Sequence, residues 1–170
     1  APMLIVGLAP GLHGANKTGR PFTGDASGDF LYQQLFDAGL ATKPHARTAD
    51  PDMHLINCRM TNAVRCVPPQ NKPTGAEITT CNGYLRQEMA AMPHLRVVFA
   101  LGRVAHEAVV KAIGGKQKDY PFAHGAAHKA ADGLWLVDTY HCSRYNTNTG
   151  RLTEQMFSTA LQTALNKAQG

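Results

Sequence analysis

Two polar loops carry most of the side chains that could do chemistry in this chain. The first, residues 7–27, follows a short apolar run and is rich in glycine and proline, so its backbone N–H groups could approach a ligand closely. The second, residues 140–152, combines His141 and Arg144 with an aromatic ring and short polar side chains. This composition is typical of a loop that holds a DNA backbone and probes a base stack, although a lone histidine after a strand is also common as a structural residue.

A third candidate segment, residues 61–74, reads TNAVRCVPPQNKPT. An amide such as Asn62 at the edge of a site could read the Watson–Crick face of a pyrimidine. The proline-rich run is also ordinary turn chemistry. In the first loop, the glycines lack the G-x-G-x-x-G spacing of a dinucleotide site, so the pattern gives little support to a phosphate cradle there.

Strands and helices alternate along the chain and would position these loops. A capping box, Thr74-x-x-Glu77, marks the start of one helix, and Gly39 marks the end of an earlier one. We expect strands at residues 3–6, 60–64, 97–101 and 134–137, and helices at residues 28–38, 74–92, 103–113 and 153–167.

This alternation predicts an α/β fold. We expect a three-layer α/β/α sandwich with a central, mostly parallel four-stranded sheet, and a single domain over residues 1–170. In such sheets the ligand lies outside the carboxyl ends of the strands. Both polar loops leave carboxyl ends, so we expect them to meet over one site.

The composition narrows the class of protein. With 170 residues, 44% hydrophobic and 17% charged, the chain resembles a globular enzyme rather than a disordered tail. Its formal net charge of +5 favours a polyanion, such as nucleic acid, as partner. No apolar run approaches the roughly 20 residues of a membrane helix, and the first residues lack the features of a signal peptide. We therefore expect a cytoplasmic monomer that contacts no membrane.

Successive motifs of the chain resemble those of the iron–sulfur uracil-DNA glycosylases, and in particular their family-five branch. The first motif of that family is similar to GLAPGLHGANKTGRPFTGDASGDFLY, and its later motifs are similar to TNAVRCVPPQNKPT, FALGRVA, PFAHGAAH and YHCSRYNTNTGRLT. They occur in the family's order and cover nearly the whole chain. The resemblance implies a bacterial-type, nucleoid-associated enzyme of base-excision repair. Such an enzyme flips uracil out of DNA and hydrolyses its N-glycosidic bond.

The resemblance also implies roles for individual residues. Phe22 matches the aromatic that stacks on the flipped base, and Asp25 matches the carboxylate that orients water and stabilises the sugar cation. His141 matches a donor to the base carbonyl oxygen, and Asn71 a polar residue that helps to hold the water. Without the family motif, Phe22 would be read as a core residue and Asp25 as a helix N-cap.

Two further sets of residues follow from the same comparison. The residues expected to bind the base are Gly7, Ala9, Pro10, Phe22 and Asn62. The residues expected to bind the DNA backbone or probe the duplex are Lys17, Arg20, Ser143, Arg144, Tyr145, Asn146 and Arg151.

The cysteines depart from the family pattern. The resemblance implies a structural four-iron cluster, for which Cys66 and Cys81 match the later two of four ligands. The other two are not present in this chain, which has no cysteine before Cys58. The family's N-terminal cluster-binding segment is thus expected to be absent, and without a cluster these residues are ordinary thiols, with no other cofactor. A second departure is Cys142, which stands where the family usually has proline after the histidine.

Two alternatives remain. The departures at the cysteines allow a DNA-binding module of the same fold that is catalytically impaired. Fold class alone allows a nucleotide-dependent enzyme that uses the first loop for phosphate. The resemblance also implies that other deaminated bases and mismatched thymine are substrates besides uracil, and the small side chain of Ala9 would leave room for them.

Overall fold

The structure is a computed structural model that describes residues 1–7, 26–44, 54–63, 75–130, 132–142 and 144–169, with the backbone alone at 26–29, 75–81 and 144–145. Five strands form one sheet in the order β2-β1-β3-β5-β4. Strands β1, β2, β3 and β5 are parallel, and β4 pairs with β5 antiparallel at one edge. The strands are β1 (Met3–Gly7), β2 (Cys58–Asn62), β3 (Val97–Leu101), β4 (Ala127–Lys129) and β5 (Trp135–Thr139).

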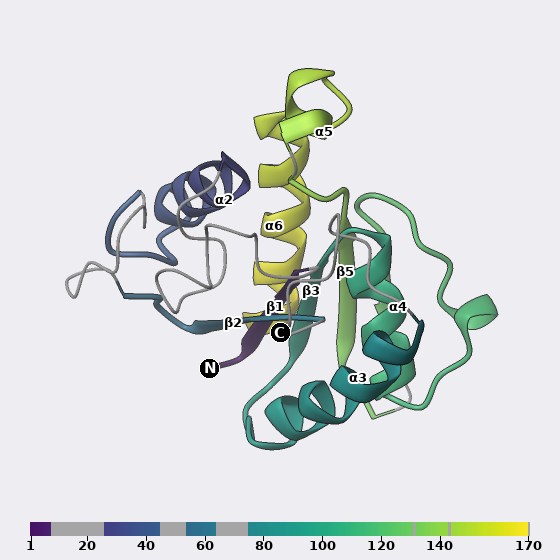
Figure 1. Cartoon of the computed structure of the whole chain (residues 1–170). Helices are drawn as coiled ribbons and strands as arrows, with labels where there is room; N and C mark the ends of the chain where they lie inside the picture. Colours follow the sequence, from purple (N-terminus) through teal and green to yellow (C-terminus); the bar gives the residue numbers. More distant parts are fainter. Residues whose placement is uncertain (8–25, 45–53, 64–74, 131, 143, 170) are drawn as a thin grey trace.

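Helices cover both faces of the sheet, because neighbouring side chains of each buried strand point to opposite faces. On β1, Met3 and Ile5 join a core cluster with α2 (Ala26–Asp37) and α6 (Glu154–Gln169). Leu4 and Val6 join the other cluster, with α3 (Gly75–Ala90) and α4 (Arg103–Ala112). Figure 1 shows the two pairs of helices on either side of the strands. The three-layer α/β/α class predicted from the sequence is confirmed.

The predicted element boundaries agree with the structure to within a few residues at α2, α3, α4, α6 and the central strands. The sheet has five strands rather than the four predicted. The additional strand, β4, has three residues that are exposed or half-buried, so it lacks the apolar alternation by which a strand is recognised. The second correction is α5 (Arg144–Asn148), a short helix inside the segment predicted as a loop.

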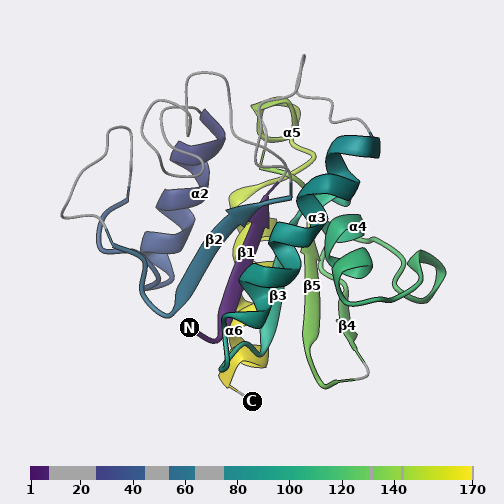
Figure 2. The same cartoon turned by 60° about the horizontal axis from the view of Figure 1, so that its bottom comes forward.

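Among the residues that the structure describes, no helix is both long and apolar enough to cross a membrane. Both chain ends lie at the end of the sheet away from α5, as Figures 1 and 2 show. The carboxyl ends of the parallel strands therefore lie on the same side as α5, and this side carries the candidate site.

Candidate functional site at the carboxyl edge of the sheet

The strand register places residues from three strands at one edge of the sheet. Gly7, the last residue of β1, pairs with Asn62, the last residue of β2. On the other side of β1, Leu101 of β3 pairs with Thr139 of β5, and the next amide, that of Gly102, donates to the Thr139 carbonyl oxygen at 2.8 Å. Gly7, Asn62 and the segment that begins at Tyr140 therefore lie along the same edge, as the sequence predicted for loops leaving carboxyl ends.

The order of the strands also locates a crevice along this edge. From β1 the chain crosses to β2 on one side and later to β3 on the other, so the direction of winding reverses between β1 and β3. In open parallel sheets, ligands bind outside the carboxyl ends at such a switch point. Gly7 ends β1 and Gly102 follows β3, the two strands that flank the switch point. Asn62 and His141 lie one strand further out on either side.

Asn62 has an unsatisfied oxygen at this edge. Its side chain is 8% exposed, and its Oδ1 atom accepts no hydrogen bond from the described residues. A buried carbonyl oxygen without a donor costs free energy. Such an atom is suited to receive an N–H from a ligand, and the base-reading role of this amide stays a prediction.

His141 is half-buried and closely packed against the start of α4. Gly102 has φ +99°, and a Cβ atom built on it would lie 3.1 Å from Cβ of His141. Glycine is therefore the residue that both the backbone angle and the neighbouring histidine require. No sequence pattern marks the approach of His141, because it depends on the tertiary structure.

The residues after His141 connect it to the core. Cys142 stands where the resembling motif usually has proline. It is 1% exposed and belongs to the core cluster that α2 and α6 form with the sheet. Asn146 donates from Nδ2 to the His141 carbonyl oxygen at 2.8 Å, and its own carbonyl accepts from the Leu152 amide at 3.0 Å. Asn146, predicted to contact DNA, thus also holds the loop together. Arg151 is exposed, with its guanidinium carbon 6.0 Å from the Tyr140 ring centroid.

Many predicted site residues lie outside the described part of the chain. These are Ala9, Pro10, Lys17, Arg20, Phe22, Asp25, Cys66, Asn71 and Ser143, together with the side chains of Cys81, Arg144 and Tyr145. The structure brings together Gly7, Asn62, His141, Asn146 and Arg151 at the carboxyl edge. The roles assigned to the other residues stay predictions.

Cys58 is not suited to bind metal. Burial raises the pKa of the Cys58 thiol to about 12, and its sulfur lies 3.8 Å from the Leu40 carbonyl oxygen, as a protonated donor would. A metal ligand must instead be a thiolate. Within the described residues, no three His, Cys, Asp or Glu side chains are arranged to hold a metal ion. A cluster would therefore depend on Cys66, Cys81 and further ligands, and no catalytic step is assigned to it.

A buried histidine–aspartate pair lies behind the site and was not recognised in the sequence. His106 of α4 and Asp138 of β5 are 1% and 0% exposed, and His106 Nδ1 lies 2.7 Å from Asp138 Oδ1. His106 Nε2 lies 2.6 Å from the Tyr120 carbonyl oxygen. Because a carbonyl only accepts, Nε2 carries a proton, and a second proton is shared between His106 and Asp138. Burial lowers the pKa of His106, but Asp138 and the Tyr120 carbonyl raise it more, so the pKa lies above its ordinary value.

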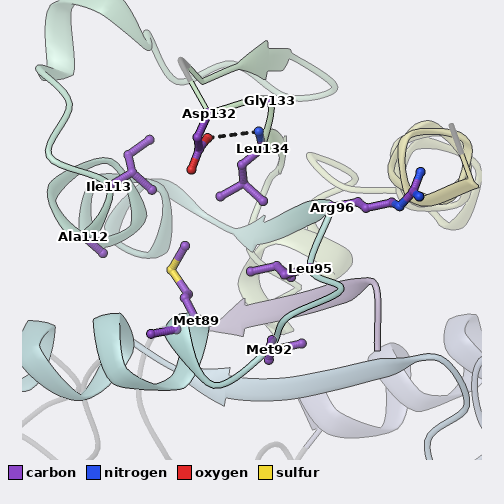
Figure 3. A pocket seen from close by; sticks show the side chains of 10 residues that line it. Met89, Met92, Leu95, Arg96, Ala112, Ile113, Asp132, Gly133 and Leu134 are labelled. Atoms are coloured by element: carbon purple, nitrogen blue, oxygen red, sulfur yellow. Dashed lines mark hydrogen bonds between the residues drawn. The ribbon is translucent and has the colours of Figure 1, made fainter.

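A cavity of about 620 Å³ lies at the opposite end of the sheet. Its lining includes Met89, Met92, Leu95 and Leu134, at the ends of α3 and α4 and the starts of β3 and β5 (Figure 3). Asp132 there accepts a hydrogen bond from the Leu134 amide. This cavity is remote from the carboxyl edge, so the candidate site remains at the switch point.

Comparisons with known proteins identify the family of the chain. The family model of the uracil DNA glycosylase superfamily matches residues 1–165. A type-5 uracil-DNA glycosylase of Thermus thermophilus is 49% identical over 164 residues, which are 96% of this chain and 74% of that protein. A type-5 uracil-DNA glycosylase of Pyrobaculum aerophilum is 42% identical over the same share of this chain and 71% of its own. A type-4 uracil-DNA glycosylase of Archaeoglobus fulgidus is 33% identical over 62% of this chain and 45% of its own. The chain belongs to the uracil-DNA glycosylase superfamily, in its type-5 branch.

Proposed function

We propose that this protein removes uracil from DNA by hydrolysing the bond between the base and the deoxyribose. The observation that carries the proposal is the match to a type-5 uracil-DNA glycosylase over 96% of the chain. The location of Asn62 and the His141 loop on either side of the switch point supports it. The partner is uracil-containing DNA, and its extruded nucleotide would enter the crevice between β1 and β3. Other deaminated bases are candidate substrates of the same pocket.

The base would be held from two sides. Asn62 Oδ1 is an acceptor in need of a donor, and the N3–H of uracil supplies one. His141 lies on the far side of the crevice and would donate to a base carbonyl oxygen. Negative charge grows on the base as the glycosidic bond breaks, so a donor at that oxygen stabilises the transition state more than the ground state. Phe22 would stack on the flipped base, with Gly7, Ala9 and Pro10 close to its edge.

The sugar end needs a carboxylate and a water. The transition state has oxocarbenium character, which a negative charge below the ring stabilises. We assign this role to Asp25, with Asn71 holding the attacking water. Lys17, Arg20 and Arg151 would bind phosphates, while Ser143, Arg144, Tyr145 and Asn146 occupy the place left by the base. Base flipping of this kind gives access to an atom that the duplex conceals.

We assign Cys66 and Cys81 as two ligands of a structural four-iron cluster, which would hold the segment between them. Visible absorbance of the purified protein and its loss in Cys66→Ser test this assignment. Colourless protein with full activity would contradict it.

Release of free uracil from a uracil-containing oligonucleotide tests the function. We expect wild-type protein to leave an abasic site. Asp25→Asn should lower the single-turnover rate by about 100-fold or more, because this variant loses a charge that acts on the transition state. Its affinity for DNA should change little. The matched control is Asp132→Asn, an exposed carboxylate at the remote cavity, for which we expect the wild-type rate. Tight DNA binding without uracil release by the wild type would instead favour the catalytically impaired module.

A further inference from the structure

His124 lies beside the His141 loop and is bonded to two separate parts of the main chain. It belongs to the segment that precedes β4 and is half-buried. Its Nδ1 atom accepts a hydrogen bond from the Tyr140 amide at 3.1 Å, and its Nε2 atom lies 3.2 Å from the Met156 carbonyl oxygen. The imidazole also stacks on the Tyr140 ring, with centroids 4.9 Å apart and 29° between the planes.

These contacts determine the tautomer of His124. A backbone amide can only donate, so Nδ1 must be unprotonated, and a carbonyl oxygen can only accept, so Nε2 must carry the proton. The Thr139 hydroxyl lies 3.3 Å from Nδ1 and donates its proton to the Tyr140 carbonyl oxygen at 3.2 Å. His124 is therefore a neutral imidazole that presents an acceptor to Tyr140 and a donor to the start of α6.

The Tyr140 amide is the group that joins β5 to the His141 loop. Strand β5 ends at Thr139, and the next peptide leaves the sheet. His124 supplies the acceptor for the amide on one side of His141, and Asn146 supplies a donor to the His141 carbonyl on the other. Gly102 packs against the Cβ atom of His141. The backbone of His141 is thus held from both ends and packed against α4.

We propose that His124 is a positioning residue that directs His141 at the base, an inference that rests on the proposed function. Both ring nitrogens of His124 are engaged by the main chain, so it does not itself serve as the donor to the base. Its effect on the reaction passes through His141, whose donor must meet the base oxygen within a fraction of an ångström. A misplacement of about 1 Å at such a group can lower a rate about 100-fold.

Two substitutions distinguish the roles of the two ring nitrogens of His124. In His124→Asn, the amide oxygen takes the place of Nδ1 and can accept from Tyr140, whereas the donor to Met156 is lost. In His124→Gln, the longer side chain keeps the donor to Met156 and loses the acceptor. We expect His124→Gln to release uracil about 10- to 100-fold more slowly in single turnover, and His124→Asn to recover most of the rate, with DNA affinity unchanged in both.

A matched control and a double variant make the test specific. His128 lies four residues further along, in β4, with Nε2 2.9 Å from the Pro121 carbonyl oxygen. It has no role in the proposal, so His128→Gln should keep the wild-type rate. In a His141→Ala background, His124→Gln should slow the reaction no further, because the donor that it positions is gone. An equal slowing with and without His141, or equal defects in the Asn and Gln variants, would overturn the proposal.

A readout that does not depend on activity separates this proposal from the proposed function. Hydrogen exchange at the Tyr140 amide should be faster in His124→Gln than in wild type, and close to wild type in His124→Asn. Wild-type protein that releases no uracil would refute the glycosylase function. Unchanged exchange in His124→Gln would refute the positioning role, whatever the activity.

Discussion

At the scale of single residues, the site depends on groups whose neighbours are distant in the sequence. In the sequence, α4, β4 and β5 lie between Gly102 and His141, yet the absence of a side chain at Gly102 leaves room for His141 in the fold. Asn62 is similar, since its oxygen is buried at the end of β2 without a donor from the described residues. The residue type alone does not give either position its role, because that role depends on neighbours that only the folded chain supplies.

Gly102→Ala tests the close approach to His141. The new methyl group would lie 3.1 Å from the His141 Cβ atom, and alanine is strained at φ +99°. We expect a loss of about 1–3 kcal/mol in the free energy of unfolding and a slower single-turnover release of uracil. Gly133→Ala is the control, because Gly133 has φ +89° with no described atom within 4 Å of a Cβ atom. It should lose stability by backbone strain but keep its rate when folded, and equal rates in the two variants would contradict the interpretation.

At the scale of elements, α4 connects the candidate site with a buried polar pair. The helix starts beside His141 at Gly102 and carries His106 one turn later. His106 joins α4 to β5 through Asp138 and to the segment before β4 through Tyr120. The same segment carries His124, which holds Tyr140. These contacts join α4, the segment before β4 and the end of β5 into one support for the His141 loop.

The stability of this support should depend on pH. In the unfolded chain His106 loses its proton near its ordinary pKa of about 6.5, whereas the folded protein keeps it to higher pH. The stabilisation is therefore complete below about pH 6.5 and is lost as pH rises through the raised pKa of the folded state. Burial also raises the pKa of the Asp138 carboxyl, so a variant at His106 alone would leave a second group whose protonation changes on folding. We therefore expect wild type to lose its stability advantage over the double variant His106→Gln/Asp138→Asn as pH rises above about 6.5, by up to about 1.4 kcal/mol per pH unit.

Denaturant unfolding of wild type and of His106→Gln/Asp138→Asn over a range of pH measures this difference. His94→Gln, at an exposed histidine before β3, is the control and should follow the wild-type curve. A difference between wild type and the double variant that grows above pH 6.5 would show that the shared proton is not held as the geometry indicates.

At the scale of the whole molecule, the candidate site lies at one end of the fold. The carboxyl ends of the parallel strands and α5 lie at this end, and both termini lie at the other (Figure 2). The formal net charge of +5 favours a polyanionic partner but does not say which face it contacts. In the proposed function, Arg151 at the carboxyl edge would touch a duplex whose nucleotide enters the crevice.

The salt dependence of DNA binding tests this arrangement. We expect the affinity for DNA to fall as salt rises, because cationic side chains release counterions from phosphates. Arg151→Ala should reduce the slope of log K against log salt by about 1, the change expected on losing one phosphate contact. Lys111→Ala, in the last turn of α4 at the other end of the sheet, should leave the slope unchanged. An equal change in both variants would mean that binding is not confined to the carboxyl edge.

The sequence by itself determined the class of fold, the main elements and the family. Apolar runs of four to five residues can be buried on both faces only in a covered parallel sheet, and capping residues and glycines delimit the helices. Short β4 and α5 escaped prediction because neither has enough apolar residues to create a period. The motifs implied roles for His141 and Asn62 from resemblance, before any geometry was considered.

Tertiary structure alone decided which groups support the site. His106 and Asp138 are 32 residues apart, and His124 and Tyr140 are 16 apart. No local pattern links such pairs, because their hydrogen bonds form only when the sheet order brings α4, β5 and the segment before β4 together. For the same reason, a histidine in the sequence could be read as a donor, a positioning residue or part of the core. The partner of each ring nitrogen in the folded chain distinguishes these roles.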